Sequence, residues 1–171
     1  IHHRLVGSEM CIRDRIKAQQ FADSLLQQAQ QVIAQWDLGT DVANPSAALG
    51  TCVLLAAERQ EDRDTHDAEQ VAELLGECAE TLLAAKGRLD PPWGEVNRHV
   101  RGGVNMPVGG GPDILRAIYG RGLKEEGFLT NVAGDGLYYL VAWDANGQLS
   151  VEGVHQFGSA TLDESSPHYS D

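Results

Sequence analysis

The chain has few of the features that mark a membrane, metal-binding or nucleic-acid-binding protein. No apolar run approaches the roughly 20 residues that a membrane-spanning helix requires. The three cysteines, Cys11, Cys52 and Cys78, have no partner ligands at zinc-site spacing. Basic residues number 13 against 25 acidic ones, and the formal net charge is −12. Because such a surface repels phosphates and anionic lipids, we expect neither nucleic acid nor a membrane as a partner.

Familiar catalytic motifs are also missing. The segment 158–160 lacks the closing glycine of the Gly-x-Ser-x-Gly nucleophile elbow. A triad of Ser159, His155 and Asp163 can be drawn, but local hydrogen bonds to backbone at a strand end explain these side chains better. The glycine-rich segment 109–112 is not followed by Gly-Lys-Ser/Thr, so it indicates a turn and not a phosphate-binding loop.

Potential metal ligands and paired carboxylates do not assemble into a recognisable site. Four histidines are scattered without paired spacing: His66, His99, His155 and His168. The stretch Asp144–Gly147 resembles the opening of a calcium loop, but the later acidic ligands do not follow, and turn chemistry explains it better. The pairs Glu125-Glu126 and Asp163-Glu164 are interpreted as solvated turns. The sequence thus predicts no catalytic, cofactor-binding or metal-binding residue in this chain, and no cofactor.

The two cysteines beyond residue 15 leave two alternatives open. Cys52 and Cys78 each lie among apolar residues of predicted helices. Small buried thiols are the favoured interpretation. A disulfide between two packed helices is the alternative in an oxidising compartment.

Residues 16–87 are expected to be helical. Apolar residues recur at helical spacing over 16–36, at Phe21, Leu25, Ala29, Val32 and Trp36. Asn44-Pro45 is expected to open a second helix, which is apolar almost all round and therefore central. A third helix is expected from about Asp67 to Lys86, with a capping box formed by Asp67 and Gln70 and a stop at Gly87.

From Pro91 onwards the pattern favours strands. They are expected over residues 95–101, 128–133, 137–143 and 149–157, with a short helical stretch at 113–119 and a loop over 104–112. The run 137–143 is apolar throughout, which predicts a strand buried on both faces. Asn146-Gly147 predicts the hairpin turn that follows. Helices followed by antiparallel strands indicate an α+β fold.

Residues 1–15 are set apart from this organisation. Back-translated, Met10–Arg15 can be read as ATG TGT ATA AGA GAC AGN, which resembles the transposase mosaic-end tag of sequencing libraries. The preceding residues show no apolar period. We therefore expect residues 1–15 to be a disordered technical scar, the alternative being a genuine N-terminus, and residues 16–171 to be the protein itself.

Two blocks in the strand-rich part resemble the penicillin acylase family, the N-terminal-nucleophile hydrolases that include acyl-homoserine lactone acylases. The first runs from Trp93 through Arg101-Gly102 to the glycine-rich segment ending at Asp113. The second runs from Gly134-Asp135 to Gly158–Thr161 and Ser165–Asp171. Together they cover roughly the last 80 residues.

The resemblance implies a periplasmic or secreted precursor that cleaves itself into a short and a long chain and folds as a four-layer αββα amidohydrolase. Such an enzyme hydrolyses a linear amide, for example a penicillin, an N-acyl-homoserine lactone or a related acyl amide, with roles in antibiotic metabolism or quorum quenching. The attacking group is the serine at the start of the long chain. The family's functional positions lie upstream of the matched blocks, so no catalytic residue is carried over.

Residues 16–171 are accordingly expected to be the C-terminal part of the long chain, inactive alone, with the rest of the precursor as partner and a small acyl amide as substrate. Four polar residues are expected to fix strand ends and the closing loop: Asp135, His155, Ser159 and His168. Two rival readings are a stand-alone non-catalytic accessory or binding domain and an independent hydrolase using Ser159. Because the strand at 137–143 needs cover on both faces, the isolated chain is expected to expose apolar surface.

Overall fold

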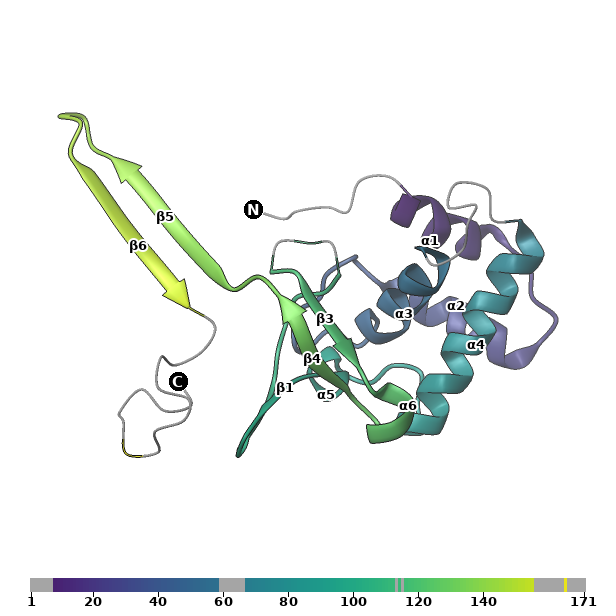
Figure 1. Cartoon of the computed structure of the whole chain (residues 1–171). Helices are drawn as coiled ribbons and strands as arrows, with labels where there is room; N and C mark the ends of the chain where they lie inside the picture. The colour runs from purple at the N-terminus through teal and green to yellow at the C-terminus, as the bar shows by residue number, and fades with distance from the viewer. Residues whose placement is uncertain (1–7, 59–66, 113, 115, 156–164, 166–171) are drawn as a thin grey trace.

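The computed structural model describes residues 8–58, 67–112, 114, 116–155 and 165. Four helices come first, and the strands follow with two one-turn helices among them. The elements are α1 (Ser8–Ala18), α2 (Ser24–Gln35), α3 (Ala47–Glu58), α4 (Ala68–Lys86), α5 (Trp93–Val96), β1 (Asn97–Arg101), β2 (Val104–Pro107), β3 (Ile118–Arg121), α6 (Leu123–Glu126), β4 (Leu129–Gly134), β5 (Leu137–Trp143) and β6 (Leu149–His155). The four longer helices and the strands occupy separate regions (Figure 1), which confirms the predicted α+β class.

The core lies among α1 to α4, with α3 at its centre as predicted. The buried residues of α3 come from all round the helix: Ala47, Ala48, Leu49, Val53, Leu54 and Ala57. The indole ring of Trp36 lies directly against Gly50 of α3, where an added Cβ would come within 2.3 Å of the ring. No helix in the described part of the chain has the length and apolar character needed to cross a membrane.

Helix α4 begins and ends where the sequence predicts. The Asp67 carboxylate accepts a hydrogen bond from the Gln70 backbone N–H, and the Gln70 side chain accepts one from the Asp67 N–H, each at 2.9 Å. This reciprocal pair is the expected capping box. Gly87 ends the helix in the left-handed conformation, with φ +70°.

The expected single helix over residues 16–36 is wrong, because the chain breaks after Ala18 and restarts at Ser24. The Asp23 carboxylate caps the new helix by accepting hydrogen bonds from the backbone N–H groups of Leu25 and Leu26, at 2.8 and 3.0 Å. An aspartate at this position competes with helix continuation by satisfying the first free donors of α2. The apolar spacing is preserved across the break, which is why periodicity alone did not reveal it.

The expectation of disorder over residues 1–15 does not hold for residues 8–15, which form most of α1. Ile12 and Ile16 are both buried, at 6% and 1% exposure, and belong to the helical core. Ile12 and Ile16 are four residues apart, so they lie on one face of the helix. The technical origin of residues 1–15 stays a prediction.

The main sheet has four strands in the order β2-β1-β4-β3, and it is mixed where an antiparallel sheet was expected. β1 pairs antiparallel with β2 and parallel with β4, and β3 pairs antiparallel with β4. Two local predictions fail here. The loop expected over 104–112 contains β2, and the helix expected over 113–119 is replaced in its described part by an extended segment that enters β3. Arg116, with φ +65°, is incompatible with that helix.

The remaining strands, β5 and β6, form a separate hairpin that projects away from the main sheet (Figure 1). Seven residue pairs join them, from Leu137↔His155 to Trp143↔Leu149. Gly147 takes φ +79° in the connecting turn, as the Asn-Gly signal predicts. The prediction that the 137–143 strand is buried on both faces is wrong in this chain, since Leu140 is 71% exposed and Trp143 67%.

Candidate functional site

The glycine-rich segment 109–112 is a packed turn, as the sequence predicts. Gly110 has φ +96°, and an added Cβ would lie 2.3 Å from the carbonyl oxygen of Arg116. The indole Nε1 of Trp93 donates a hydrogen bond to the carbonyl oxygen of Gly110 at 2.7 Å. The buried side chain of Asn97 donates to the carbonyl oxygen of Val108 at 2.9 Å. The first block of the family resemblance is therefore held together by its own internal hydrogen bonds.

Asp135 fixes the end of a strand, as expected. Its Oδ2 accepts hydrogen bonds from the Ala117 backbone N–H and from the Tyr138 hydroxyl, both at 2.7 Å. These donors hold the pKa of the Asp135 carboxyl below its usual value, the Tyr138 hydrogen bond being the larger cause. Of the other residues expected in this role, the side chain of His155 and all of Ser159 and His168 lie outside the described part of the structure.

Asp144 is used by the hairpin turn, which supports turn chemistry over a calcium loop. Its Oδ1 accepts hydrogen bonds from the backbone N–H groups of Asn146 and Gln148, both at 2.8 Å. These backbone donors lower the pKa of the Asp144 carboxyl. Glu126, expected in a loop, ends the short helix α6, where one of its carboxylate oxygens accepts a hydrogen bond from Thr130 Oγ1 at 2.8 Å. Within the described ranges, no group of three or more His, Cys, Asp or Glu residues could hold a metal ion.

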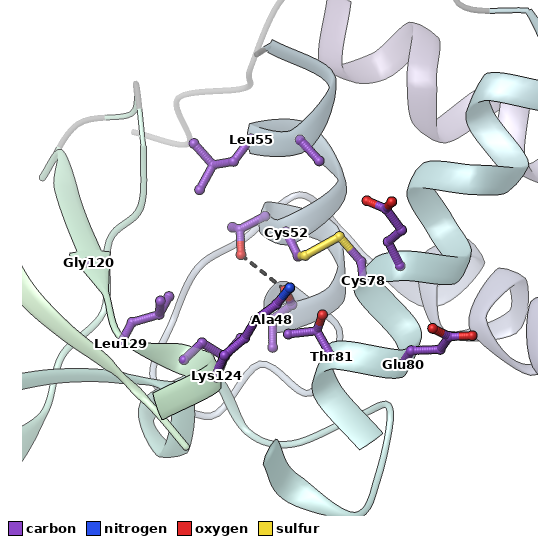
Figure 2. Close-up of a pocket in the computed structure, with 13 residues that line it drawn as sticks. Ala48, Cys52, Leu55, Cys78, Glu80, Thr81, Gly120, Lys124 and Leu129 are labelled. Atoms are coloured by element: carbon purple, nitrogen blue, oxygen red, sulfur yellow. Dashed lines mark hydrogen bonds between the residues drawn. A yellow bond between two sulfur atoms is a disulfide. The ribbon is translucent and has the colours of Figure 1, made fainter. Parts of the chain in front are cut away.

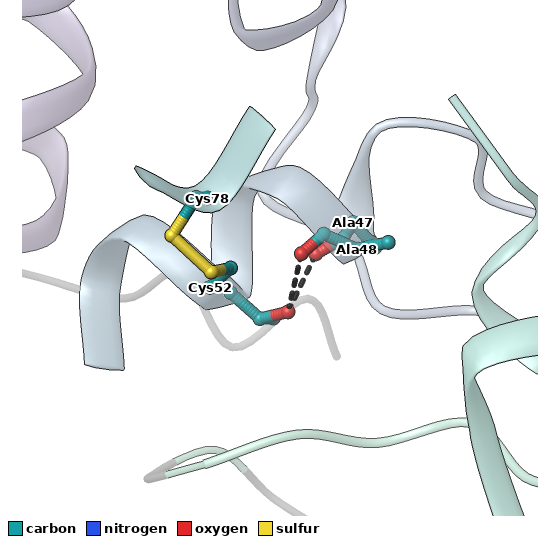
Figure 3. The surroundings of a disulfide bond; sticks show 5 residues. Ala47, Ala48, Cys52 and Cys78 are labelled. Atoms are coloured by element: carbon teal, nitrogen blue, oxygen red, sulfur yellow. Dashed lines mark hydrogen bonds between the residues drawn. A yellow bond between two sulfur atoms is a disulfide. The ribbon is translucent and has the colours of Figure 1, made fainter. Parts of the chain in front are cut away.

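Cys52 and Cys78 form a disulfide between α3 and α4, so the favoured interpretation of two buried thiols is wrong and the disulfide alternative is confirmed. Their Cα atoms are 5.8 Å apart, within the usual range for a disulfide. Beside the bond, the Thr51 hydroxyl donates to the carbonyl oxygens of Ala47 and Ala48, at 2.7 and 3.3 Å (Figure 3). Thr51 is buried but satisfied by its own helix.

A cavity of about 500 Å³ opens beside the disulfide. Its walls come from α3, α4, α6 and the adjoining ends of β3 and β4 (Figure 2). The apolar surface is provided by the disulfide together with Ala48, Leu55, Ala56, Leu123 and Leu129. The polar residues are Thr51 and Thr81, Lys124, and the glutamates Glu77 and Glu80. In Figure 2 the Lys124 ammonium points toward Ala48 and the disulfide, whereas the Glu80 carboxylate points away from them.

The lining of this cavity combines apolar and polar side chains, and it holds no nucleophile with a neighbouring base. The Thr51 hydroxyl is engaged with helix carbonyls, and the cysteines are oxidised. Lys124 is exposed at the rim. The volume lies within the range of small-molecule pockets, about 300–1,000 Å³. No sequence signal pointed to this recess, because its walls come from five elements that only the fold brings together.

A second cavity, of about 390 Å³, lies on the main sheet. It is lined by His99, Met106, Val108, Ile118, Asn131, Val132, Ala133 and Gly134. Both polar atoms of the Asn131 amide are buried and have no hydrogen-bond partner. An unpartnered buried polar group costs about 1–3 kcal/mol. An asparagine inside a predicted strand was the available signal, because asparagine is depleted in strands.

The pKa of one lysine, Lys86, is lowered for structural reasons. Lys86, in the last turn of α4, donates from Nζ to the carbonyl oxygen of Glu95 at 2.7 Å. Partial burial lowers the pKa of Lys86, and the charge of Glu95 opposes this shift. The side chain lines neither cavity, so we assign it a role in joining α4 to α5 and none in chemistry.

The fold and these sites define an α+β protein that carries the cavities described above and, in the described residues, no assembled catalytic group. Searches against models of known protein families and against curated protein sequences give no match. The function is therefore argued from the residues and their geometry.

Proposed function

We propose that residues 16–171 are the C-terminal, non-catalytic part of the long chain of a penicillin acylase-like amidohydrolase. The parent enzyme would hydrolyse a linear amide, such as a penicillin, an N-acyl-homoserine lactone or a related acyl amide. Its nucleophile is the N-terminal serine of the long chain, whose own amino group serves as base, and it lies outside these residues. Within this proposal the main sheet and hairpin contribute to the αββα fold, and no described residue acts on the substrate.

The observation that carries this proposal is the uncovered apolar face of the β5–β6 hairpin. Strand pairing places six apolar side chains on one face, between 45% and 67% exposed: Leu137, Tyr139, Val141, Trp143, Leu149 and Val151. No charged residue interrupts them. The Tyr139 ring lies over Gly153 of the neighbouring strand. Apolar surface of this extent marks a protein interaction site, and the remaining layers of a longer precursor would cover it.

Two further observations support the proposal. Trp93 and Asn97, in the first block of the family resemblance, donate hydrogen bonds to the carbonyl oxygens of Gly110 and Val108, as expected of residues that complete a fold. The Cys52–Cys78 disulfide fits a periplasmic or secreted enzyme, because disulfides form and persist in oxidising compartments.

The test is to express the native reading frame extended upstream of Ile16 in an oxidising compartment. We expect a precursor that cleaves itself into two co-purifying chains and releases chromophore from an acyl anilide. Replacing the new N-terminal serine by alanine should abolish the hydrolysis without unfolding the protein. Residues 16–171 expressed alone should be inactive. Amidase activity in this short form, or an extended product that neither cleaves itself nor hydrolyses any acyl amide, would overturn the proposal.

The second candidate is a stand-alone accessory or binding domain. The observation in its favour is the helical half, which encloses its own core, is cross-linked by a disulfide and borders a cavity of about 500 Å³. This candidate predicts a monomer that melts cooperatively and does not bind a dye for exposed apolar surface. The amidohydrolase proposal predicts strong dye binding by the hairpin face in the isolated chain.

A further inference from the structure

Asn131 and the cavity that it lines on the main sheet have no part in the proposed function. Asn131 lies in the interior of β4, opposite Gly120 of β3. On the other side of β4 lies β1, whose Arg98 pairs with Thr130. The next residue of β1, His99, is therefore beside Asn131, and His99 pairs in turn with Met106 of β2. A single row across the sheet therefore runs Met106, His99, Asn131 and Gly120. Gly120 adds no side chain to this row, so space remains beside the asparagine.

The amide of Asn131 has both its donor and its acceptor unsatisfied. Nδ2 and Oδ1 are each buried without a hydrogen-bond partner, although buried polar groups in folded proteins are almost always paired. A Cβ built on Gly120 would lie 3.5 Å from Oδ1, so the glycine neither supplies a hydrogen bond from a side chain nor blocks the oxygen. The donor Nδ2 and the acceptor Oδ1 lie side by side, so a molecule with an adjacent acceptor and donor can pair with both.

The surroundings restrict what that molecule can be. The cavity wall is formed mainly by apolar side chains, including Met106, Val108 and Ile118. Met106 is 51% exposed, and its unbranched thioether side chain can move to admit a ligand to the shielded amide. A volume of about 390 Å³ admits a small organic molecule. Apart from His99, the described lining includes no titratable side chain, so it suits a neutral ligand better than an ion.

We propose that this cavity binds a neutral carboxamide with an apolar substituent, through a paired hydrogen bond to Asn131. The ligand's carbonyl oxygen accepts from Nδ2, and its N–H donates to Oδ1. The apolar substituent packs on Met106, Val108 and Ile118. The proposal stands on Asn131 and its cavity alone, and it is independent of the amidohydrolase proposal because binding here involves no bond cleavage.

The experiment is a titration of the full chain with benzamide and with N,N-dimethylbenzamide, followed by the ¹H–¹⁵N resonances of the side-chain amides. The two compounds share the ring and the carbonyl, but the second lacks the N–H donor. We expect benzamide to shift the Asn131 side-chain resonance and to bind about tenfold more tightly than its dimethyl analogue, because the latter leaves Oδ1 unpaired. The Asn131 resonance is identified by its absence from Asn131→Leu.

Three variants complete the test. Asn131→Leu and Asn131→Asp should lose benzamide binding, because the first has no polar atoms and the second lacks the Nδ2 donor. Lys124→Gln, which alters the other cavity, should bind benzamide as the unmodified chain does. Equal affinity for the two compounds, no detectable benzamide binding, or retained binding in Asn131→Leu would overturn the proposal. If Asn131→Leu does not fold, the comparison of the two compounds on the unmodified chain decides the question.

Discussion

The Nε1 atom of Trp93 lies 2.7 Å from the carbonyl oxygen of Gly110 and donates a hydrogen bond to it. Both residues are buried. The bond links the helix α5 to the glycine-rich turn, two segments that are 17 residues apart in the chain. A buried carbonyl needs a hydrogen-bond donor, and the indole supplies it here.

Trp93→Phe should therefore destabilise the protein beyond the loss of packing. Phenylalanine keeps an aromatic ring but leaves the Gly110 carbonyl buried and unpaired, so we expect the free energy of unfolding to fall by about 1–3 kcal/mol. Urea denaturation followed by circular dichroism measures the change. Trp143→Phe, on the exposed hairpin face, is the matched control and should stay within about 0.5 kcal/mol of the unmodified chain. Equal effects of the two substitutions would contradict a structural role for the indole N–H.

Removing the disulfide should destabilise the helical half. Cys52 and Cys78 are 26 residues apart, and closing a loop of that length corresponds to about 3–4 kcal/mol in the chain-entropy model. We expect a loss of this size in the double variant Cys52→Ala/Cys78→Ala, measured by urea denaturation without reductant. Adding reductant should destabilise the unmodified chain by a similar amount and leave the double variant unchanged. A double variant as stable as its parent would show that the cross-link is dispensable.

Replacing each of two helical glycines by alanine should change the stability of the protein in opposite directions. At Gly50 a Cβ would lie 2.3 Å from the Trp36 ring, so Gly50→Ala forces the core apart and should cost about 1–3 kcal/mol despite the gain in helix propensity. At Gly76 the nearest atom, Leu26 Cδ2, would be 3.6 Å away, an ordinary contact. Gly76→Ala should therefore stabilise α4 by up to about 1 kcal/mol. Thermal melting of both variants measures the contrast, and stabilisation by Gly50→Ala would show that Trp36 does not pack on α3.

The Asp135 carboxylate should make stability depend on acid pH. Its pKa in the folded chain is lowered by the donors on Tyr138 and Ala117. A lowered pKa means that the stabilisation is complete above the ordinary value, about 3.9, and is lost as the pH falls through the folded value. Asp135→Asn should therefore show a smaller fall in melting temperature between neutral and acid pH than the unmodified chain. Tyr138→Phe, which removes the main donor, should reduce the fall as well. Identical pH profiles for all three proteins would exclude this contribution.

Features of the structure that depend on neighbouring residues could be predicted from the sequence. The Asp67–Gln70 capping box, the stop at Gly87, the turn at Gly147 and the apolar faces of α3 and α4 each depend on residues a few positions apart. Helix α2 shows the limit of this reasoning, because the cap at Asp23 and an unbroken apolar spacing favoured different structures, and the cap prevailed. The parallel pairing of β1 with β4 could not be predicted, since it joins residues about 30 positions apart.

The candidate sites could not be predicted from the sequence, because they too depend on residues that are far apart in the chain. The recess beside the disulfide has walls from five elements, and the unsatisfied amide of Asn131 is recognisable only once its neighbours are known. For β5 the sequence predicted burial, and the structure shows exposure. Its apolar run predicted burial, which depends on what covers the strand, and the described part of this chain provides no cover for Tyr139 or Trp143.

The bond between Cys52 and Cys78 also determines what a break in the backbone can do. A single cut anywhere in residues 53–77 divides the peptide into two pieces that remain covalently joined. The two pieces would migrate as one band in a gel without reductant and separate only when thiol is added. The piece that precedes the cut would stay attached through this bond to the piece that carries the sheet.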